Sequence, residues 1–290
     1  MSKIAASELI LNNDGSIYHL NLKPEHIAST IITVGDQDRV SDVTKHFDSI
    51  EFSTQKREFK TETGSYKGKR ISVISTGIGP DNIDIVLNEL DALVNIDLEK
   101  KQIKDTHTSL DIIRIGTSGS IQADIPVDSF LISKFGLGLD GMIQAYECEH
   151  ILETEIEEAF IKHTNWNTRK ARPYVVKNSA ELERRLRSDL TLVGFTATAV
   201  GFYGPQGRVL RLPIKNKDLN QKMDTFNFNN TRVTNLEMET SAIYALAKLL
   251  GHNALSMNAI IANRANGTFS KHPKQTVDEL IAYTLQKLIE

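Results

Sequence analysis

The sequence predicts an α/β fold, in which a mixed, mostly parallel sheet is flanked by helices in a three-layer arrangement. Three observations predict it: short apolar runs rich in Ile and Val recur, longer segments of helical periodicity separate them, and polar glycine-bearing loops follow several runs. Strands in a parallel sheet read as continuous apolar runs because helices cover both faces. With 40% hydrophobic and 24% charged residues, the 290-residue chain has the composition of an ordinary globular protein.

Six apolar runs are predicted to form buried strands, and in chain order they are Ile31–Val34, Ile71–Ser75, Ile112–Ile115, Phe130–Ser133, Leu192–Phe195 and Ala259–Ala262. Four helices are predicted between and after them, namely Asp81 to about Lys101, Glu181–Asp189, Met238–Leu250 and a C-terminal helix that starts near Thr276. Pairs that resemble capping boxes, Asn178 with Glu181 and Thr276 with Glu279, mark two of the helix starts. We find no repeat and no low-complexity linker, so we expect one domain over residues 1–290.

Composition and charge exclude several classes of protein. The net charge is −3 with no block of one sign, which argues against a dedicated nucleic-acid binder. The single cysteine, Cys148, allows no internal disulfide and fits a reducing compartment. The N-terminal segment lacks the pattern of a signal peptide, and no stretch approaches the ~18 apolar residues of a membrane span. We therefore expect a cytoplasmic protein with no membrane partner and no need of a metal to fold.

Two loops that follow predicted strands carry candidate anion-binding groups. Gly35 and Arg39 follow the first strand, where a glycine N–H and a guanidinium could bind an anion together. The alternative, a helix start with Asp36 as cap and Arg39 paired to an acid, stays open. Arg114 lies inside an apolar run that leads into Thr117, and a buried strand tolerates a charge only with a partner. Phosphate is one such partner, and a buried carboxylate is the other.

Two further loops carry groups suited to a base and a sugar. Phe202, Gln206 and Arg208 combine an aromatic ring, an amide and a guanidinium, which complement the acceptor–donor–acceptor edge of uracil. Glu237 and Glu239 could accept hydrogen bonds from the hydroxyls of a ribose. The alternatives are a surface turn for the first loop and a helix N-terminus, which favours acidic residues, for the second.

Taken together and in this order, the four segments resemble the nucleoside phosphorylase superfamily. This superfamily contains uridine phosphorylases, purine nucleoside phosphorylases and methylthioadenosine nucleosidases. The resemblance runs from Tyr18 to about Asn266, which is most of the chain. It implies phosphorolysis of a nucleoside in salvage or catabolism, with inorganic phosphate as co-substrate and with no metal or coenzyme.

The resemblance also implies a role for individual residues. It assigns phosphate binding to Gly35, Arg39, Arg57, Arg114 and Thr117, base binding to Phe202, Gln206, Arg208 and Arg264, and ribose binding to His19, Glu237, Met238 and Glu239. His19 and Arg57 resemble residues that the family lends to the site of a neighbouring subunit. A homo-oligomer is therefore expected, either a dimer or a hexamer built from three dimers.

The resemblance favours a pyrimidine, and uridine in particular. Gln206 and Arg208 match the residues that read uracil, and Asn263-Arg264 stands where purine enzymes of the superfamily place Ser-Asp. A purine nucleoside phosphorylase would need an acid there, a nucleosidase should lack the phosphate arginines, and a non-catalytic nucleoside-binding protein should lack polar site residues.

Three positions depart from the family pattern. Gln37 stands where proline is usual, the turn Gly77–Asn82 lacks the usual serine, and Asp128 stands where glycine is common.

Overall fold

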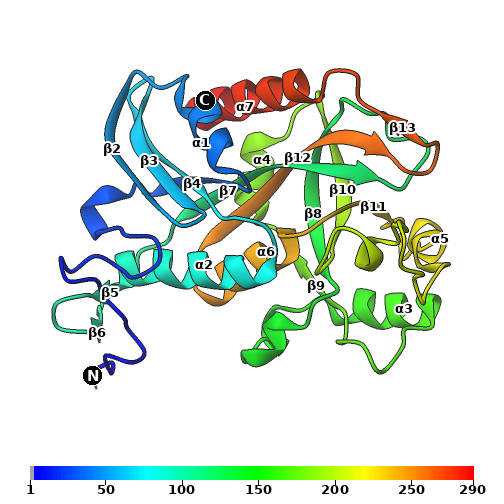
Figure 1. Ribbon diagram of the computed structural model, residues 1–290, viewed down its shortest axis with the longest axis horizontal. Coiled ribbons are helices and arrows are strands. Elements are labelled where there is room, and N and C mark those ends of the chain that lie inside the picture. The colour runs from blue at the N-terminus through cyan, green and yellow to red at the C-terminus, as the bar shows by residue number, and fades with distance from the viewer. Residues whose placement is uncertain (1–2) are drawn as a thin grey trace.

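The computed structural model describes residues 3–290, and one 11-stranded mixed sheet organises them (Figure 1). The strands of this sheet are β1 (Thr30–Val34), β2 (Ser49–Lys56), β3 (Phe59–Tyr66), β4 (Lys69–Ser75), β7 (Asp111–Ser120), β8 (Phe130–Gly138), β9 (Tyr174–Lys177), β10 (Thr191–Thr198), β11 (Val233–Glu237), β12 (Asn253–Asn263) and β13 (Thr268–Phe269). A separate hairpin is formed by β5 (Ile96–Asp97) and β6 (Gln102–Ile103).

The helices are α1 (Gln37–Thr44), α2 (Pro80–Asn95), α3 (Thr154–Thr164), α4 (Ala180–Leu186), α5 (Leu219–Asp224), α6 (Thr240–Leu249) and α7 (Pro273–Ile289). Four short 3-10 helices accompany them, η1 (Pro24–His26), η2 (Met142–Ala145), η3 (Glu149–Ile151) and η4 (Gly204–Gln206). None of the helices within residues 3–290 is long and apolar enough to cross a membrane. Cys148 is buried and unpaired.

The sheet runs in the order β13-β12-β8-β10-β11-β7-β1-β4-β3-β2, and β9 pairs with β8. Because β12 pairs with β7 as well as with β8, five strands close into a ring, and β1, β4, β3 and β2 extend from it. The central pairs β1–β4, β1–β7, β7–β12, β8–β10 and β10–β11 are parallel. The sheet is mixed but not mostly parallel as expected. Antiparallel pairs join β7 to β11 and β8 to β12 within the ring, and the hairpins of β2, β3 and β4 and the short strands β9 and β13 add others at the margins.

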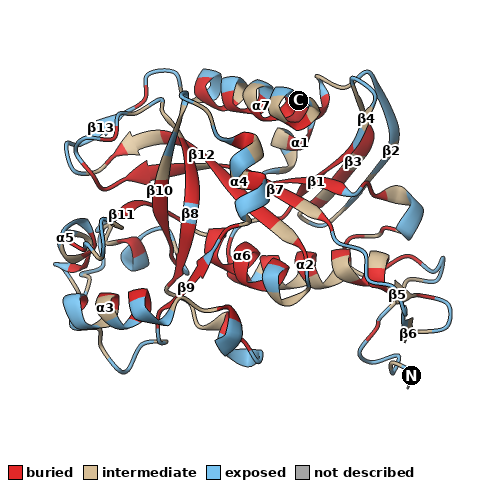
Figure 2. Ribbon diagram, turned by 180° about the vertical axis from the view of Figure 1, so that it is seen from behind, coloured by how far each residue is buried: buried red, intermediate tan, exposed pale blue. Residues whose placement is uncertain are grey.

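Helices cover both faces of the sheet, and the strands between them are mostly buried (Figure 2). On one face Leu87 and Leu90 of α2 pack with Ile243 of α6 in one apolar core. On the other face Val40 of α1 and Leu280 of α7 belong to a second core that also includes α4. The predicted three-layer α/β fold is therefore confirmed, and all six predicted strands are present.

Several boundaries differ from the prediction. The side chain of Ser179, and not that of Asn178, caps α4, and it accepts a hydrogen bond from the Leu182 N–H. The last helix starts at Pro273, so Thr276 lies inside it and donates to the His272 carbonyl. Helix α2 ends at Asn95, where the backbone turns into the β5–β6 hairpin.

Other elements gave a weak signal in the sequence. The edge strand β2 has one exposed face and no apolar run, and β11 carries polar residues although all five of its residues are buried.

Candidate functional site

A cavity of about 850 Å³ opens where the carboxyl ends of the parallel strands β1, β4 and β7 meet those of β10 and β11, which run antiparallel to β7. This is where ligands bind in open α/β folds. All four loops that the sequence singled out line it: Gly35–Arg39 after β1, Thr117–Gly119 in β7, Phe202 with Gln206 and Arg208 after β10, and Leu236–Glu239 after β11. The turn after β4 contributes Gly77 and Ile78, and Ile261 and Ala262 of β12 complete the wall.

The first loop starts a helix and also offers a cation to the cavity. Asp36 is the N-cap of α1, and its carboxylate accepts the Asp38 N–H at 2.9 Å. The helix start of the alternative is therefore present, whereas its second part, an ion pair of Arg39 with an acid, is not found within residues 3–290. Arg39 follows in the first turn and lines the cavity. Within residues 3–290 its guanidinium forms no ion pair. Burial lowers the pKa of Arg39, and the nearby charge of Arg114 lowers it further.

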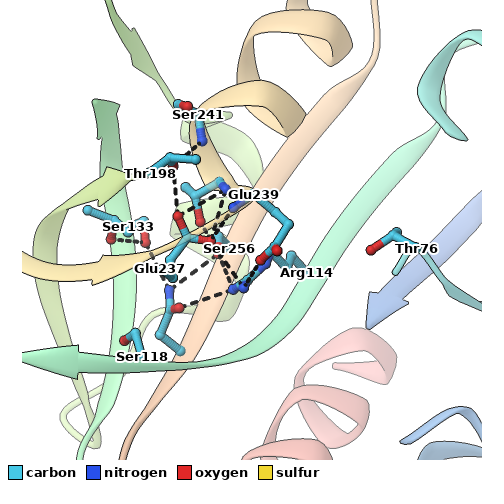
Figure 3. A network of polar contacts seen from close by, with 12 residues as sticks. Thr76, Arg114, Ser118, Ser133, Thr198, Glu237, Glu239, Ser241 and Ser256 are labelled. Carbon is cyan, nitrogen blue, oxygen red and sulfur yellow. Dashed lines mark hydrogen bonds and ion pairs between the residues drawn. The ribbon is translucent and has the colours of Figure 1, made fainter. Parts of the chain in front are cut away.

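Arg114 is buried in β7, and both terminal nitrogens of its guanidinium have partners (Figure 3). Its Nη2 lies 2.6 Å from Glu239 Oε2 and 3.1 Å from Glu237 Oε2, and its Nη1 donates to Asn258 Oδ1 at 3.1 Å and to Ser256 Oγ at 3.4 Å. Burial alone acts to lower the pKa of Arg114, but the two carboxylates outweigh it, so the net shift is upward. The alternative of a buried carboxylate partner is therefore correct, and Arg114 lines the cavity all the same.

Gly116 makes room for this guanidinium. A Cβ atom added at Gly116 would lie 2.0 Å from Nη1 and 2.4 Å from Cζ of Arg114. No side chain of residue 116 fits in that space. The guanidinium of Arg114 occupies it, because Gly116 has no side chain. The glycine of the Gly-Thr-Ser-Gly segment thus accommodates the arginine, while Thr117 lines the cavity as expected.

The two glutamates of the fourth loop, Glu237 and Glu239, have different hydrogen-bond partners. Glu237 accepts the backbone N–H groups of Glu239 and Thr240 and the hydroxyl of Thr198, in addition to the contact with Arg114. Its carboxylate is thus held at the start of α6 and also lines the cavity, so its role in ribose binding stays a prediction. Glu239 accepts the Gly79 N–H at 3.0 Å and lies against Arg114, and burial is the main cause that raises its pKa. Met238 also lines the cavity.

The base loop is held together by its own arginine. Nη1 of Arg208 donates to Gln206 Oε1 at 2.5 Å and to the Phe202 carbonyl at 2.7 Å, and the guanidinium lies 3.8 Å from the centre of the Phe202 ring. Gln206 is buried, and its Oε1 is fixed as an acceptor for Arg208. One face of Phe202 is therefore covered by Arg208, which leaves a single face for a ligand.

Arg264 supports this loop from outside the cavity. It was expected in the base pocket, but it is absent from the side chains that line the cavity within residues 3–290. Its Nη1 donates to the Gln206 carbonyl at 2.6 Å, and Asn220 donates to the same oxygen at 3.1 Å. The adjacent Asn263 donates to the carbonyls of Gln122 and Ile125, which fixes the end of β12.

His19 and Arg57 lie outside this cavity and near each other. Arg57 occupies the turn between β2 and β3 at a φ of 56°, and its guanidinium is 5.9 Å from the centre of the Tyr18 ring. The rings of Tyr18 and His19 meet edge to face at 4.8 Å. Glu58, next to Arg57, does line the cavity. The two residues that the resemblance assigns to a neighbour are thus grouped at one surface.

Sequence reasoning missed the residues that hold Arg114 from behind. Ser256 and Asn258 are polar and buried within the apolar strand β12. The signal that singled out Arg114, a polar residue inside an apolar run, was also present there. It also missed Glu58 and Asn82, which line the cavity and belong to the turn after β2 and to the first turn of α2.

Comparison with known proteins gives one consistent family. The sequence profile of the Phosphorylase superfamily matches residues 29–289. A uridine phosphorylase of Thermococcus kodakarensis is 30% identical over 93% of this chain and 86% of its own length. A crystal structure of a Trypanosoma brucei nucleoside phosphorylase that shows uridine phosphorylase activity has a TM-score of 0.86 and 29% identity, covering 97% of this chain and 99% of that chain. A purine nucleoside phosphorylase of the DeoD type from Listeria welshimeri is 25% identical over 94% of this chain and 99% of its own length.

Proposed function

Since the chain belongs to the Phosphorylase superfamily, we propose that it splits uridine with inorganic phosphate, giving uracil and ribose 1-phosphate. The relatives with uridine phosphorylase names or activity support this substrate. The cavity supports it as well, because its lining includes groups suited to uracil, Gln206 and Arg208, and two further arginines suited to phosphate, Arg39 and Arg114. The reaction needs no metal or coenzyme in this proposal, because charged side chains meet the charges that develop.

The observation that carries the proposal is the state of Arg39. Its guanidinium is partly buried beside a second cation, Arg114, and no carboxylate within residues 3–290 forms an ion pair with it. The charge of Arg114 is met by Glu237 and Glu239, whereas Arg39 has no ion-pair partner within residues 3–290 and would gain most from an anion bound beside it. A phosphate dianion would supply that charge, with Gly35 and Thr117 lining the same part of the cavity. A nucleosidase, which uses water, has no need of such a pair.

The proposed mechanism is a displacement at C1′ of the ribose. Phosphate, held by Arg39 and Arg114, attacks C1′ while the bond to N1 of uracil breaks, so positive charge grows on the sugar and negative charge on the base. Glu239 would hold the 2′-hydroxyl and favour the cationic sugar. The donors Arg208 and Gln206 would stabilise the uracil oxygens, and each such donor is typically worth about 3–4 kcal/mol.

A pyrimidine is favoured over a purine at the base end of the cavity. The residues there are Phe202, Gln206, Arg208, Ile261, Ala262 and Phe269. None of these six carries a carboxylate, which a purine enzyme would use to protonate the base at N7. The structure also leaves Arg264 anchoring Gln206, so we assign it to the positioning of the base loop and not to direct contact with the base.

We further propose that the active species is at least a dimer. His19 and Arg57 lie together at a surface beside the Glu58 edge of the cavity, outside the cavity wall of their own chain. In a dimer, Arg57 would reach the phosphate of the neighbour and His19 its ribose 5′-hydroxyl.

Product analysis tests the proposal directly. The protein is incubated with uridine or with inosine, each with and without inorganic phosphate, and release of the free base is followed. We expect uracil to appear only with phosphate, together with ribose 1-phosphate. Equal release without phosphate would indicate a nucleosidase, and preferential release of hypoxanthine would indicate a purine enzyme.

A further inference from the structure

The backbone around His19 is bound by one buried carboxylate from helix α2. Oε1 of Glu89 accepts the His19 N–H at 3.0 Å and contacts His19 Nδ1 at 2.6 Å. Oε2 accepts the Leu20 N–H at 2.8 Å and the His19 N–H at 3.1 Å. The Glu89 side chain is only 13% exposed, so these contacts lie largely out of solvent. Hydrogen bonds to a charged group are among the stronger ones in proteins.

This carboxylate also fixes the tautomer of the ring. An ionised carboxylate can only accept, so Nδ1 of His19 must carry the proton in the contact with Glu89. In the neutral ring, Nε2 is then an acceptor, and it forms no hydrogen bond within residues 3–290. The side chain of His19 is 26% exposed, which leaves Nε2 available to a group from outside the chain.

The segment is clamped from a second side. Nζ of Lys56 donates to the Tyr18 carbonyl and to Asn12 Oδ1, and it lies 4.3 Å from the centre of the Tyr18 ring. The segment Tyr18–Leu20 has no regular secondary structure, and these contacts replace the hydrogen bonds of a helix or strand. The histidine is thus held in one place by a carboxylate on one side and an ammonium on the other.

We propose that Glu89 is a positioning residue for catalysis: it holds His19 as the Nδ1–H tautomer and presents Nε2 as an acceptor to the 5′-hydroxyl of the nucleoside bound by the partner subunit. This inference rests on the proposed uridine phosphorolysis in a dimer. It adds a residue in α2 that touches no substrate and acts only through His19.

The isosteric variant Glu89→Gln reverses the arrangement. Its amide oxygen can accept the Leu20 N–H only if the amide nitrogen faces His19 Nδ1. The amide N–H then donates to Nδ1, so Nδ1 has to be the unprotonated, accepting nitrogen of the ring. The proton moves to Nε2, which can then only donate. The 5′-hydroxyl has to turn in order to accept from it, and the O–H of the nucleoside loses the acceptor that it has in the wild type. In this orientation the His19 N–H keeps the amide oxygen at the Oε2 position, 3.1 Å away, whereas the opposite orientation would set the amide N–H against the Leu20 N–H and is disfavoured.

Kinetics with two substrates separate positioning from folding. Wild type, Glu89→Gln, His19→Ala and the surface control Glu99→Gln are assayed with uridine and with 5′-deoxyuridine, which lacks the hydroxyl. For uridine, we expect Glu89→Gln to lower kcat/KM about three- to tenfold, mainly through KM, the size of one hydrogen bond. For 5′-deoxyuridine, Glu89→Gln and His19→Ala should equal wild type. Glu99→Gln should equal wild type with both.

Nitrogen-15 NMR of the His19 ring provides a readout apart from activity. We expect the Nδ1–H tautomer in wild type and the Nε2–H tautomer in Glu89→Gln, whereas Glu89→Asp, which keeps a charged acceptor, should retain the Nδ1–H form. Should the amide variant not fold, Glu89→Ala, which leaves Nδ1 without its acceptor, takes its place, and the Nδ1–H form should then lose its preference over Nε2–H. Equal losses on both substrates, or an unchanged tautomer, would overturn the role of Glu89. If wild type releases no uracil with phosphate, the proposed function itself fails.

Discussion

Replacing Arg39 with methionine should separate phosphate binding from stability. The variant removes a guanidinium that forms no ion pair within residues 3–290 and that is destabilised by burial and by the charge of Arg114. Methionine keeps an unbranched apolar stem of similar length, so packing at the start of α1 is largely retained. The folded state therefore loses no ion pair. Burial and the repulsion from Arg114, which the variant removes, outweigh the attraction of Asp36, Asp42 and Glu239, which it also loses.

The expected loss lies in phosphate affinity. A hydrogen bond between a charged donor and an anion is worth about 1.5–3 kcal/mol, which corresponds to roughly 10- to 150-fold in an equilibrium constant. We expect KM for phosphate to rise by about that factor in Arg39→Met. The free energy of unfolding without phosphate should be unchanged or higher.

Two measurements check the prediction. Initial rates of uracil release are recorded against phosphate concentration at saturating uridine, and urea unfolding is followed with and without phosphate. A ligand at 100 times its dissociation constant stabilises the folded state by about 2.7 kcal/mol, and Arg39→Met should lose most of this increment at the same phosphate concentration. A variant with normal KM for phosphate would refute the reasoning. So would a variant that is markedly less stable than wild type without phosphate, because it would reveal a structural partner.

The other predictions concern the same cavity. Arg114→Met leaves two buried carboxylates without their cation, so it should lose about 3–5 kcal/mol in urea unfolding as well as at least ~10²-fold in kcat/KM, and a stable variant would contradict the buried pairing. Gly116→Ala should give the same combined loss by displacing that guanidinium, and normal kinetics would show that the close approach is dispensable. Arg264→Ala should raise KM for uridine severalfold and leave KM for phosphate unchanged, because it removes the donor to the Gln206 carbonyl. A change in KM for phosphate alone would count against this role. Burial raises the pKa of Glu239, so its protonated form is favoured by folding; this group stabilises most below its unfolded value of about 4.3, and the contribution is lost as pH rises through the folded pKa. The free energy of unfolding is measured with urea for wild type and Glu239→Gln as pH rises from about 4.3. It should fall less for the variant than for wild type, and parallel curves would disprove the assignment.

The apolar runs predicted the fold because burial on both faces leaves a direct trace in composition. Strand β12 and helix α6 were found this way, with small errors at their ends. The edge strand β2 was not found, since solvent covers one of its faces and relaxes the pattern. The C-terminal helix was placed too late because Thr276 imitates a cap, whereas its hydroxyl bonds to the His272 carbonyl and to Asp128.

The sequence also located the cavity wall but not the pairing within it. Arg114 was conspicuous as a charge in an apolar strand, yet its partners come from β11 and β12, which are far away in the chain. A motif shows residue types and not which oxygen is already occupied, so the contacts that hold Glu237 at the start of α6 were not predicted. The contact of Glu89 with His19 joins residues 70 positions apart and had no local signature.

In the proposed site, the carboxylate of Glu239 has a consequence for how the two substrates change each other's affinity. One of its oxygens accepts the Gly79 N–H at the start of α2, and the other contacts Arg114. A nucleoside that draws on this carboxylate and an oxyanion that draws on the arginine compete with a bond that already joins the two groups. The affinity of each co-substrate therefore depends on occupancy by the other, and thermodynamic reciprocity requires the two effects to be equal in size.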